Sequence, residues 1–188
     1  MENQVLDTGL IANDDQSQNR YAGFWIRVGA QILDTLILIP LIGINMVNIY
    51  NLKSFPLQIT ITILMILYKP FMEYKYSATF GKMIVKIKVV DMNFGQINLH
   101  QAILRYVPWI FRHIFALYST VILFQHPGFI DAKGVYEVGL LQNELISPAL
   151  NYIGSAVVLI SCVVVGFTAN KQGIHDILAK TLCIYKNN

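Results

Sequence analysis

The chain has 188 residues, of which 55% are hydrophobic and only 13% are charged. A soluble domain of ordinary composition carries about 25% charged residues, so this deficit excludes a typical water-soluble protein and indicates a membrane protein. The two cysteines fall in no disulfide or metal-binding spacing. We therefore expect no metal and no cofactor, and the predicted partner is the lipid bilayer rather than nucleic acid.

The first 20 residues are polar and lack the basic start and short apolar core of a cleavable signal peptide. We predict a polar tail over residues 1–20 and one transmembrane domain over residues 21–188. Four apolar stretches in this domain each approach the roughly 20 residues that a helix needs to cross a bilayer. They cover residues 28–50, 56–74, 104–124 and 149–169. The predicted fold is an all-α integral membrane protein with four transmembrane helices.

Lysine and arginine in the connecting segments predict the orientation, because cytoplasmic loops carry an excess of these residues. The segment between the second and third spans and the C-terminal segment are rich in lysine, whereas each of the other two loops contains a single lysine. We therefore expect both termini and residues 75–104 on the cytoplasmic side. Residues 46–55 and 126–147 should face outward, and an even number of spans agrees with this arrangement.

An aspartate inside the first apolar stretch, Asp34, is the residue least expected at its position. It lies seven residues after Arg27, so the two share a helix face, with Asp34 about 10 Å deeper. In the third stretch Arg112 lies seven residues after Arg105, at nearly the depth of Asp34. A lone charge at the bilayer centre costs at least about 2.5 kcal/mol. We therefore expect the first and third spans to pack together through an Asp34–Arg112 ion pair.

More charges are expected at the cytoplasmic ends of the same helices. Glu73 lies near the end of the second span and Asp176 follows the fourth, where Arg27 and Arg105 are available to both. Three cations then face three anions, which is the balance that a buried network needs in order to remain charged. The predicted network consists of Arg27, Asp34, Glu73, Arg105, Arg112 and Asp176.

This network has two interpretations. Paired ions inside a bundle can fix which helices are neighbours, without any ligand. Ionisable groups within spans are also candidates for an ion or proton path. Long side chains that reach the headgroups explain Arg27 and Arg105, but the side chain of Asp34 is too short to do so.

The segment between the second and third spans is more than a linker. Residues 82–90 alternate in polarity, which is typical of a half-buried strand, and residues 91–96 contain the Asp, Asn and Gly of a turn. Residues 96–99 could then pair back as a short cytoplasmic β-hairpin. An amphipathic helix on the membrane surface over residues 79–90 is the alternative, and either form places lysines at anionic headgroups.

Three motifs occur in order along the chain: an arginine and an aspartate in the first span, a T-x-G-K string followed by V-V-D, and an H-D-x-x-A-x-T string after the last span. Their residues are Arg27 and Asp34, then Thr79, Gly81 and Lys82, then His175 and Asp176. The T-x-G-K string lacks the other glycine and the following Ser/Thr of a phosphate-binding loop. Together the motifs resemble the RDD family, small multi-span bacterial membrane proteins named for one arginine and two aspartates.

The resemblance covers residues 21–185 and implies a bacterial cytoplasmic membrane protein, with cation/proton antiport proposed for some members. The leading hypothesis is a small transporter or transport accessory that exchanges a monovalent cation for protons. In this hypothesis Asp34 alternates between proton and cation, Arg112 tunes its affinity, and Arg27, Glu73 and Asp176 gate the cytoplasmic entrance. The alternative is a non-catalytic membrane scaffold or assembly subunit whose buried ion pairs fix helix packing.

We do not expect an enzyme. His175 and Asp176 are adjacent, so they diverge by about 100° on a helix, and no activated nucleophile accompanies them in the sequence. The outer halves of the spans contain few polar residues, which is a thin lining for an ion path through one subunit. We therefore expect a homo-oligomer or another membrane protein as a partner.

Overall fold

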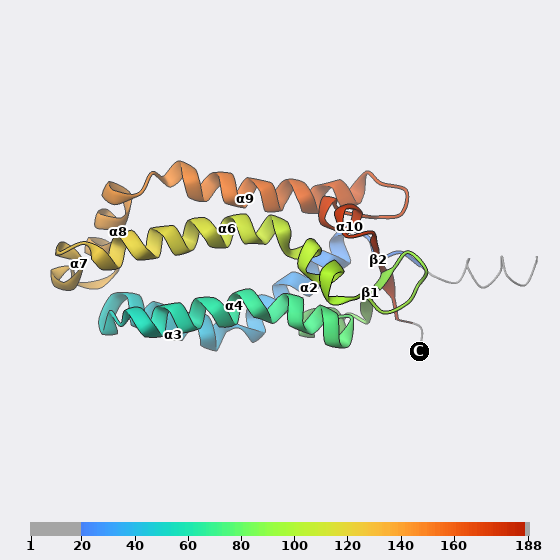
Figure 1. The fold of residues 1–188 in the computed structure, drawn as a ribbon, viewed down its shortest axis with the longest axis horizontal. Coiled ribbons are helices and arrows are strands. Elements are labelled where there is room, and N and C mark those ends of the chain that lie inside the picture. The colour runs from blue at the N-terminus through green and yellow to red at the C-terminus, as the bar shows by residue number, and fades with distance from the viewer. Residues whose placement is uncertain (1–19, 187–188) are drawn as a thin grey trace, which may run out of the picture.

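The computed structural model describes residues 20–186, and Figure 1 shows an elongated helix bundle with a small sheet at one end. Except for Arg20, the predicted polar tail lies outside the described residues. The longer helices are α2 (Phe24–Ile37), α3 (Ile39–Val47), α4 (Phe55–Tyr76), α6 (Leu99–Gln125), α8 (Gly134–Leu145) and α9 (Pro148–Val163). The short helices are α5 (Phe80–Ile84), α7 (Gly128–Asp131) and α10 (Ile174–Leu178), and the strands are β1 (Ile87–Asp91) and β2 (Thr181–Tyr185). We call the end with the strands the sheet end and the end with α7 and α8 the loop end.

The structure has two helices, α4 and α6, that are long and apolar enough to cross a bilayer. α2 and the following helical segment Ile39–Leu52 form a third candidate span if they are taken together, although they bend by 50°. Pro40 explains this break, because a proline at the start of α3 has no N–H with which to continue the hydrogen bonds of α2. α9 is apolar but shorter, and tightens into a 3-10 turn at Val164–Gly166. The described chain is therefore a mostly helical membrane protein with two or three candidate spans, whereas the sequence predicted four.

The helix neighbours differ from the predicted ones. α6 packs against α4 and α9, while α2 packs mainly against the short helix α5. The contact between α2 and α5 is so close that a Cβ atom at Gly81 would lie 2.0 Å from the carbonyl oxygen of Ala30. Only glycine fits at this position. The expectation that the first and third spans pack together is therefore corrected, because α5 takes the place beside α2 that was assigned to α6.

The predicted strand exists, but its predicted partner is wrong. β1 pairs antiparallel with β2, in a register that runs from Ile87 opposite Tyr185 to Asp91 opposite Thr181. Residues 96–99 do not form the second strand, because Asn98 begins α6 with a capping box. Residues 80–84 form a helix, so the segment combines part of each predicted alternative.

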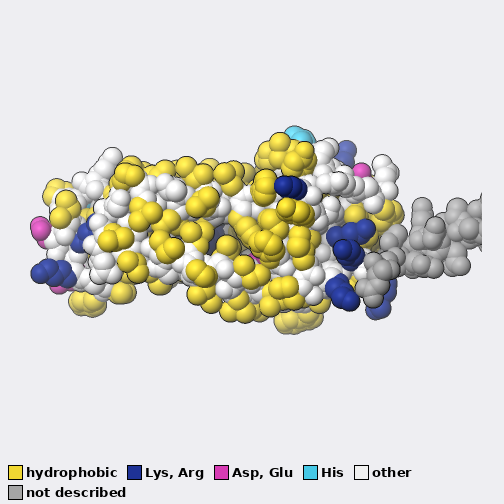
Figure 2. All heavy atoms as spheres, turned by 90° about the horizontal axis from the view of Figure 1, so that it is seen from below, with side chains coloured by type: hydrophobic (Ala, Val, Ile, Leu, Met, Phe, Trp, Pro, Cys, Tyr) yellow, Lys and Arg dark blue, Asp and Glu magenta, His cyan; other side chains and the backbone are white. Residues whose placement is uncertain are grey.

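Large apolar side chains cover the outside of the bundle. Figure 2 shows them along the length of one face, with lysine and arginine gathered near the sheet end. Leu67 of α4 and Leu159 of α9 are 56% and 63% exposed. An apolar surface of this extent is one that a bilayer covers. The sheet end has a small core of its own, formed by Ala22, Ala30, Ile87 and Cys183.

Candidate functional site

Charged side chains from distant parts of the chain meet inside the sheet end. Each comes from a different helix, and each is buried or nearly buried. In chain order, these side chains lie on α2, α4, α5, α6 and α10. We call the following five residues the charge network: Arg27, Glu73, Lys82, Arg105 and Asp176.

Arg105 is the centre of the charge network. Its Nε donates to Oε2 of Glu73 at 2.8 Å, and its Nη1 forms an ion pair with Asp176. Nη1 also donates to the hydroxyl of Thr181 at 2.6 Å. The guanidinium therefore joins α4 to α10 and β2, and it is only 3% exposed.

Each acid of the charge network has two cationic partners. Glu73 accepts from Lys82 and Arg105, and Asp176 pairs with Arg27 and Arg105. Burial by itself would raise the pKa of Asp176, but the guanidinium groups beside it hold that pKa well below its usual range. Three cations share two carboxylates, so the charge balance of three to three expected from the sequence is corrected.

Asp34 belongs to a separate arrangement. Its carboxylate accepts from the hydroxyl of Tyr68 at 2.8 Å, the hydroxyl of Thr79 at 2.6 Å and the backbone N–H of Gly81 at 2.7 Å. Thr79 caps α5 from the position just before it, so Asp34 lies at the N-terminus of that helix. Neutral donors of this kind stabilise a carboxylate without a cation.

The predicted Asp34–Arg112 ion pair is wrong. Arg112 is exposed, and its backbone faces α9, where a Cβ atom at Gly154 would lie 3.3 Å from its Cα. The backbone of α6 at Arg112 packs against α9, while the Arg112 side chain stays exposed. Arg112 therefore does not belong to the buried site.

The T-x-G-K string forms the link between these two arrangements. Thr79 donates to Asp34, Gly81 allows α5 to approach α2, and Lys82 extends to Glu73. The string therefore fastens α5 to both α2 and α4. Nothing in these contacts resembles a phosphate-binding loop.

His175 lies beside the charge network, with Asp176 next to one of its ring nitrogens. Its Nδ1 is 2.8 Å from the hydroxyl of Ser161, and its Nε2 is 3.4 Å from Asp176. Burial lowers the pKa of His175 to about 3. The order Ser161–His175–Asp176 resembles a hydrolase triad, but Ser161 is 1% exposed and its oxygen already accepts the backbone N–H of His175. A buried hydroxyl without substrate access does not support nucleophilic catalysis.

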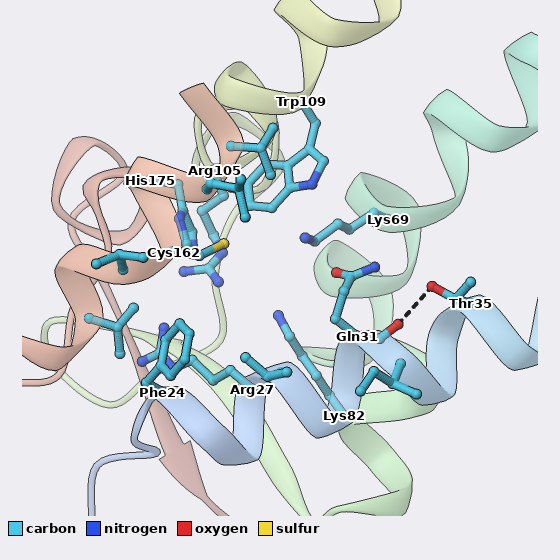
Figure 3. Close-up of a pocket in the computed structure, with 16 residues that line it drawn as sticks. Phe24, Arg27, Gln31, Thr35, Lys69, Lys82, Arg105, Trp109, Cys162 and His175 are labelled. Atoms are coloured by element: carbon cyan, nitrogen blue, oxygen red, sulfur yellow. Dashed lines mark hydrogen bonds between the residues drawn. The ribbon is translucent and has the colours of Figure 1, made fainter. Parts of the chain in front are cut away.

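A cavity of about 300 Å³ adjoins the charge network, between α2 and α9. Figure 3 shows Lys69 and Lys82 pointing into its open centre, with Trp109 beside Lys69. The described lining contains four cationic side chains and no Asp or Glu. Its cations are Arg27, Lys69, Lys82 and Arg105. Within residues 20–186 there is also no group of three His, Cys, Asp or Glu residues placed to hold a metal ion.

Sequence reasoning missed several of these residues. Tyr68 and Ser161 gave no signal, because single hydroxyl groups are common within apolar stretches. Thr181 closes the HDILAKT string and could have been found from that motif. Lys69 gave no signal either, because a long side chain near the end of a span can reach the headgroups, whereas here its ammonium group points inward and lies 3.6 Å from the centre of the Trp109 ring.

The fold and the site define a small multi-helix membrane protein whose helices are joined at one end by buried charges and a two-stranded sheet. The chain belongs to the RDD family, which matches residues 21–180. The resemblance seen in the sequence is thereby confirmed. Its arginine and two aspartates lie at one end of the bundle, where Arg27 pairs with Asp176 and Asp34 holds α5. No curated protein and no solved structure matches the chain.

Proposed function

We propose that the chain is a non-catalytic membrane scaffold or assembly subunit whose buried ion pairs fix the arrangement of its helices. The observation that supports this most is the position of Arg105 between Glu73 of α4 and Asp176 of α10. With Arg27 and Lys82, it connects four helices to the segment that follows the last apolar helix. Such pairs specify which helices are neighbours.

Cation/proton exchange is the other function expected from the sequence, and it requires a carboxyl that trades a proton for a cation. Asp34 has three neutral donors, and Glu73 and Asp176 each have two cationic partners. The cavity beside the charge network is lined by four cations, which repel a monovalent cation. These contacts favour the scaffold over the exchanger.

The proposal includes four spans in a bacterial cytoplasmic membrane, with the sheet end on the cytoplasmic side. α9 and its 3-10 turn cover residues 148–166, or about 28 Å at 1.5 Å per residue. This length approaches the ~30 Å of a hydrocarbon core. Lysine and arginine gather near the sheet end. Because cytoplasmic segments carry an excess of these residues, this supports a cytoplasmic sheet end. The partner we propose is another membrane protein or a second copy of the chain.

Cysteine labelling tests this topology. Cys162 and Cys183 are first replaced by alanine, and single cysteines are then introduced at the exposed positions Lys133 and Lys75. Lys133→Cys at the loop end should react with a membrane-impermeant maleimide on intact cells. Lys75→Cys at the sheet end should react only after the membrane is permeabilised. The opposite pattern would reverse the orientation.

A flux assay separates the scaffold from the exchanger. Proteoliposomes with an imposed pH gradient should retain it when sodium or potassium is added, because a scaffold moves neither ion nor proton. A cation-dependent loss of the gradient that disappears in Asp34→Asn, but persists in Lys133→Ala, would support exchange through Asp34 and contradict the proposal.

A further inference from the structure

Lys69 is a cation inside the helix bundle whose attraction to an acid is shared, because Glu73, four residues further along α4, already pairs with Lys82 and Arg105. It lies in α4, seven residues before Tyr76, so its Cα is about 10 Å from that end of the helix. Within residues 20–186 its ammonium group makes no hydrogen bond and no ion pair, and its described contact is with the face of Trp109. An ammonium group at this depth normally faces a partner of opposite charge. The structure therefore has a place for an anion beside Lys69.

The charges around Lys69 increase the need for an anion at this site. Arg27, Lys82 and Arg105 already share Glu73 and Asp176, which leaves one positive charge in excess. Lys69 brings the excess to two, since His175 is neutral. Asp34 does not offset it, because that carboxylate is bound at the N-terminus of α5 and does not line the cavity. Buried cations that outnumber their partners are costly, and an anion from outside the chain would restore the balance.

The shape of the cavity specifies what kind of anion can enter. Its cations reach the open centre from α2, α4, α5 and α6, and apolar side chains of α2 and α9 form much of the remaining wall. Two of these, Ile32 and Leu159, are 56% and 63% exposed, so the cavity is open beside them. The cavity therefore adjoins the apolar surface that faces lipid. A free hydrated ion would have to lose its water to enter across that surface, whereas a bilayer lipid reaches it by lateral diffusion.

We propose that this cavity binds the anionic headgroup of a membrane phospholipid, with its phosphate at Lys69 and its acyl chains along the apolar walls of α2 and α9. Arginine and lysine are the usual protein ligands of phosphate oxygens. The cavity of about 300 Å³ has the size of a small ligand pocket. Lys69 lies about 10 Å from the sheet end of α4, so a headgroup bound there is drawn inward from the level of the other headgroups. The site is independent of the scaffold proposal, because a carrier or a scaffold could equally hold a structural lipid.

Trp109 provides a reporter inside the site. The chain has two tryptophans, and the other, Trp25, is 81% exposed and can be replaced by phenylalanine. The full-length Trp25→Phe protein is reconstituted in bilayers of unlabelled phosphatidylcholine that contain a minor fraction of phospholipid brominated on the acyl chains. Brominated phosphatidylglycerol should quench Trp109 more strongly than brominated phosphatidylcholine at the same mole fraction. Equal quenching by the two lipids would overturn the proposal.

Variants of Lys69 identify the charge responsible. Lys69→Gln should weaken the preference for phosphatidylglycerol about fivefold, as expected for one lysine near a bilayer surface, and Lys69→Arg should restore it. Lys75→Gln is the matched control, since this lysine is exposed on the same helix. An unchanged preference in Lys69→Gln would remove Lys69 from the site. If Lys69→Gln does not fold, the comparison of the two lipids on the parent protein still decides the proposal.

Soluble anions separate a lipid from free phosphate. Millimolar inorganic phosphate or glycerol 3-phosphate should leave the excess quenching by phosphatidylglycerol unchanged, because neither carries the acyl chains that occupy the apolar walls. Loss of the excess with either anion, at constant ionic strength, would show that the site takes the phosphate group alone and would contradict the lipid assignment.

Discussion

The two ends of the bundle bury polar groups in different ways. At the sheet end, the buried groups are ions from helices far apart in the sequence. At the loop end, the side chains of Asn48 and Gln58 hydrogen-bond to each other at 3.0 Å, and Asn48 also bonds to the backbone of Ser54. Lys53 also lies there, and its ammonium group donates to the backbone carbonyls of residues 129, 130 and 132 rather than to an acid.

The difference follows from the distance in sequence that each end must connect. Asn48 and Gln58 flank one tight turn, so two neutral amides suffice to hold it. Arg27 and Asp176 are 149 positions apart, and their helices have no short loop to keep them together. Charges attract at longer range than hydrogen bonds, but they are costly if one partner is missing. We therefore expect the sheet end to be the more sensitive to single substitutions.

The largest effect is expected for Arg105→Gln. This change leaves Glu73 and Asp176 without their common partner in a buried site, which typically costs about 3–5 kcal/mol. The measurement is the free energy of unfolding in a detergent titration. Arg112→Gln, on the exposed face of the same helix, is the control and should change it by less than about 0.5 kcal/mol. Similar losses in both variants would contradict the assignment of Arg105 as the centre.

Gly81→Ala should destabilise the sheet end by about 1–3 kcal/mol, the usual cost of forcing an extra carbon into a packed site. The added Cβ would lie 2.0 Å from the carbonyl oxygen of Ala30, so α5 must move away from α2. Gly139→Ala in α8 is the matched control at the loop end, because nothing lies within 4 Å of its added Cβ. Equal thermal shifts for the two variants would argue against close contact of α5 and α2.

Acid should destabilise the sheet end through His175. Burial lowers its pKa to about 3, so the folded protein keeps it neutral while the unfolded chain binds a proton below about pH 6.5. The stabilisation is complete above pH 6.5 and is lost toward pH 3, by at most about 1.4 kcal/mol per pH unit. Unfolding titrations from pH 7 to 5 should show a shallower slope in His175→Gln. His126→Gln at the loop end should retain the slope of the wild type.

The smallest effect expected is the coupling between Asp34 and Arg112. Because the two residues do not meet, the losses in Asp34→Asn and Arg112→Gln should add in the double variant, within about 0.5 kcal/mol. If the double variant is more stable than Asp34→Asn alone, the result would support the Asp34–Arg112 ion pair that the sequence predicted.

Sequence reasoning found the charges but not all of their partners. Arg27, Glu73, Arg105 and Asp176 were placed at one end, because charges at the ends of apolar stretches have few other positions available. Depth along a helix follows from residue spacing, whereas the rotation of α6 that exposes Arg112 depends on contacts with α9. For the same reason β2 was missed, because a strand that pairs across about 90 residues leaves no local signal of its partner.

The antiparallel pairing of β1 with β2 has a consequence for biosynthesis. A ribosome releases Arg27 and Arg105 long before it releases residues 176–185, which provide Asp176 and the second strand. During that interval the apolar helices are already available for insertion while two of their arginines lack one carboxylate. Residues 176–185 therefore neutralise charges that were inserted much earlier, and a chain interrupted before them would leave Arg27 without its carboxylate partner.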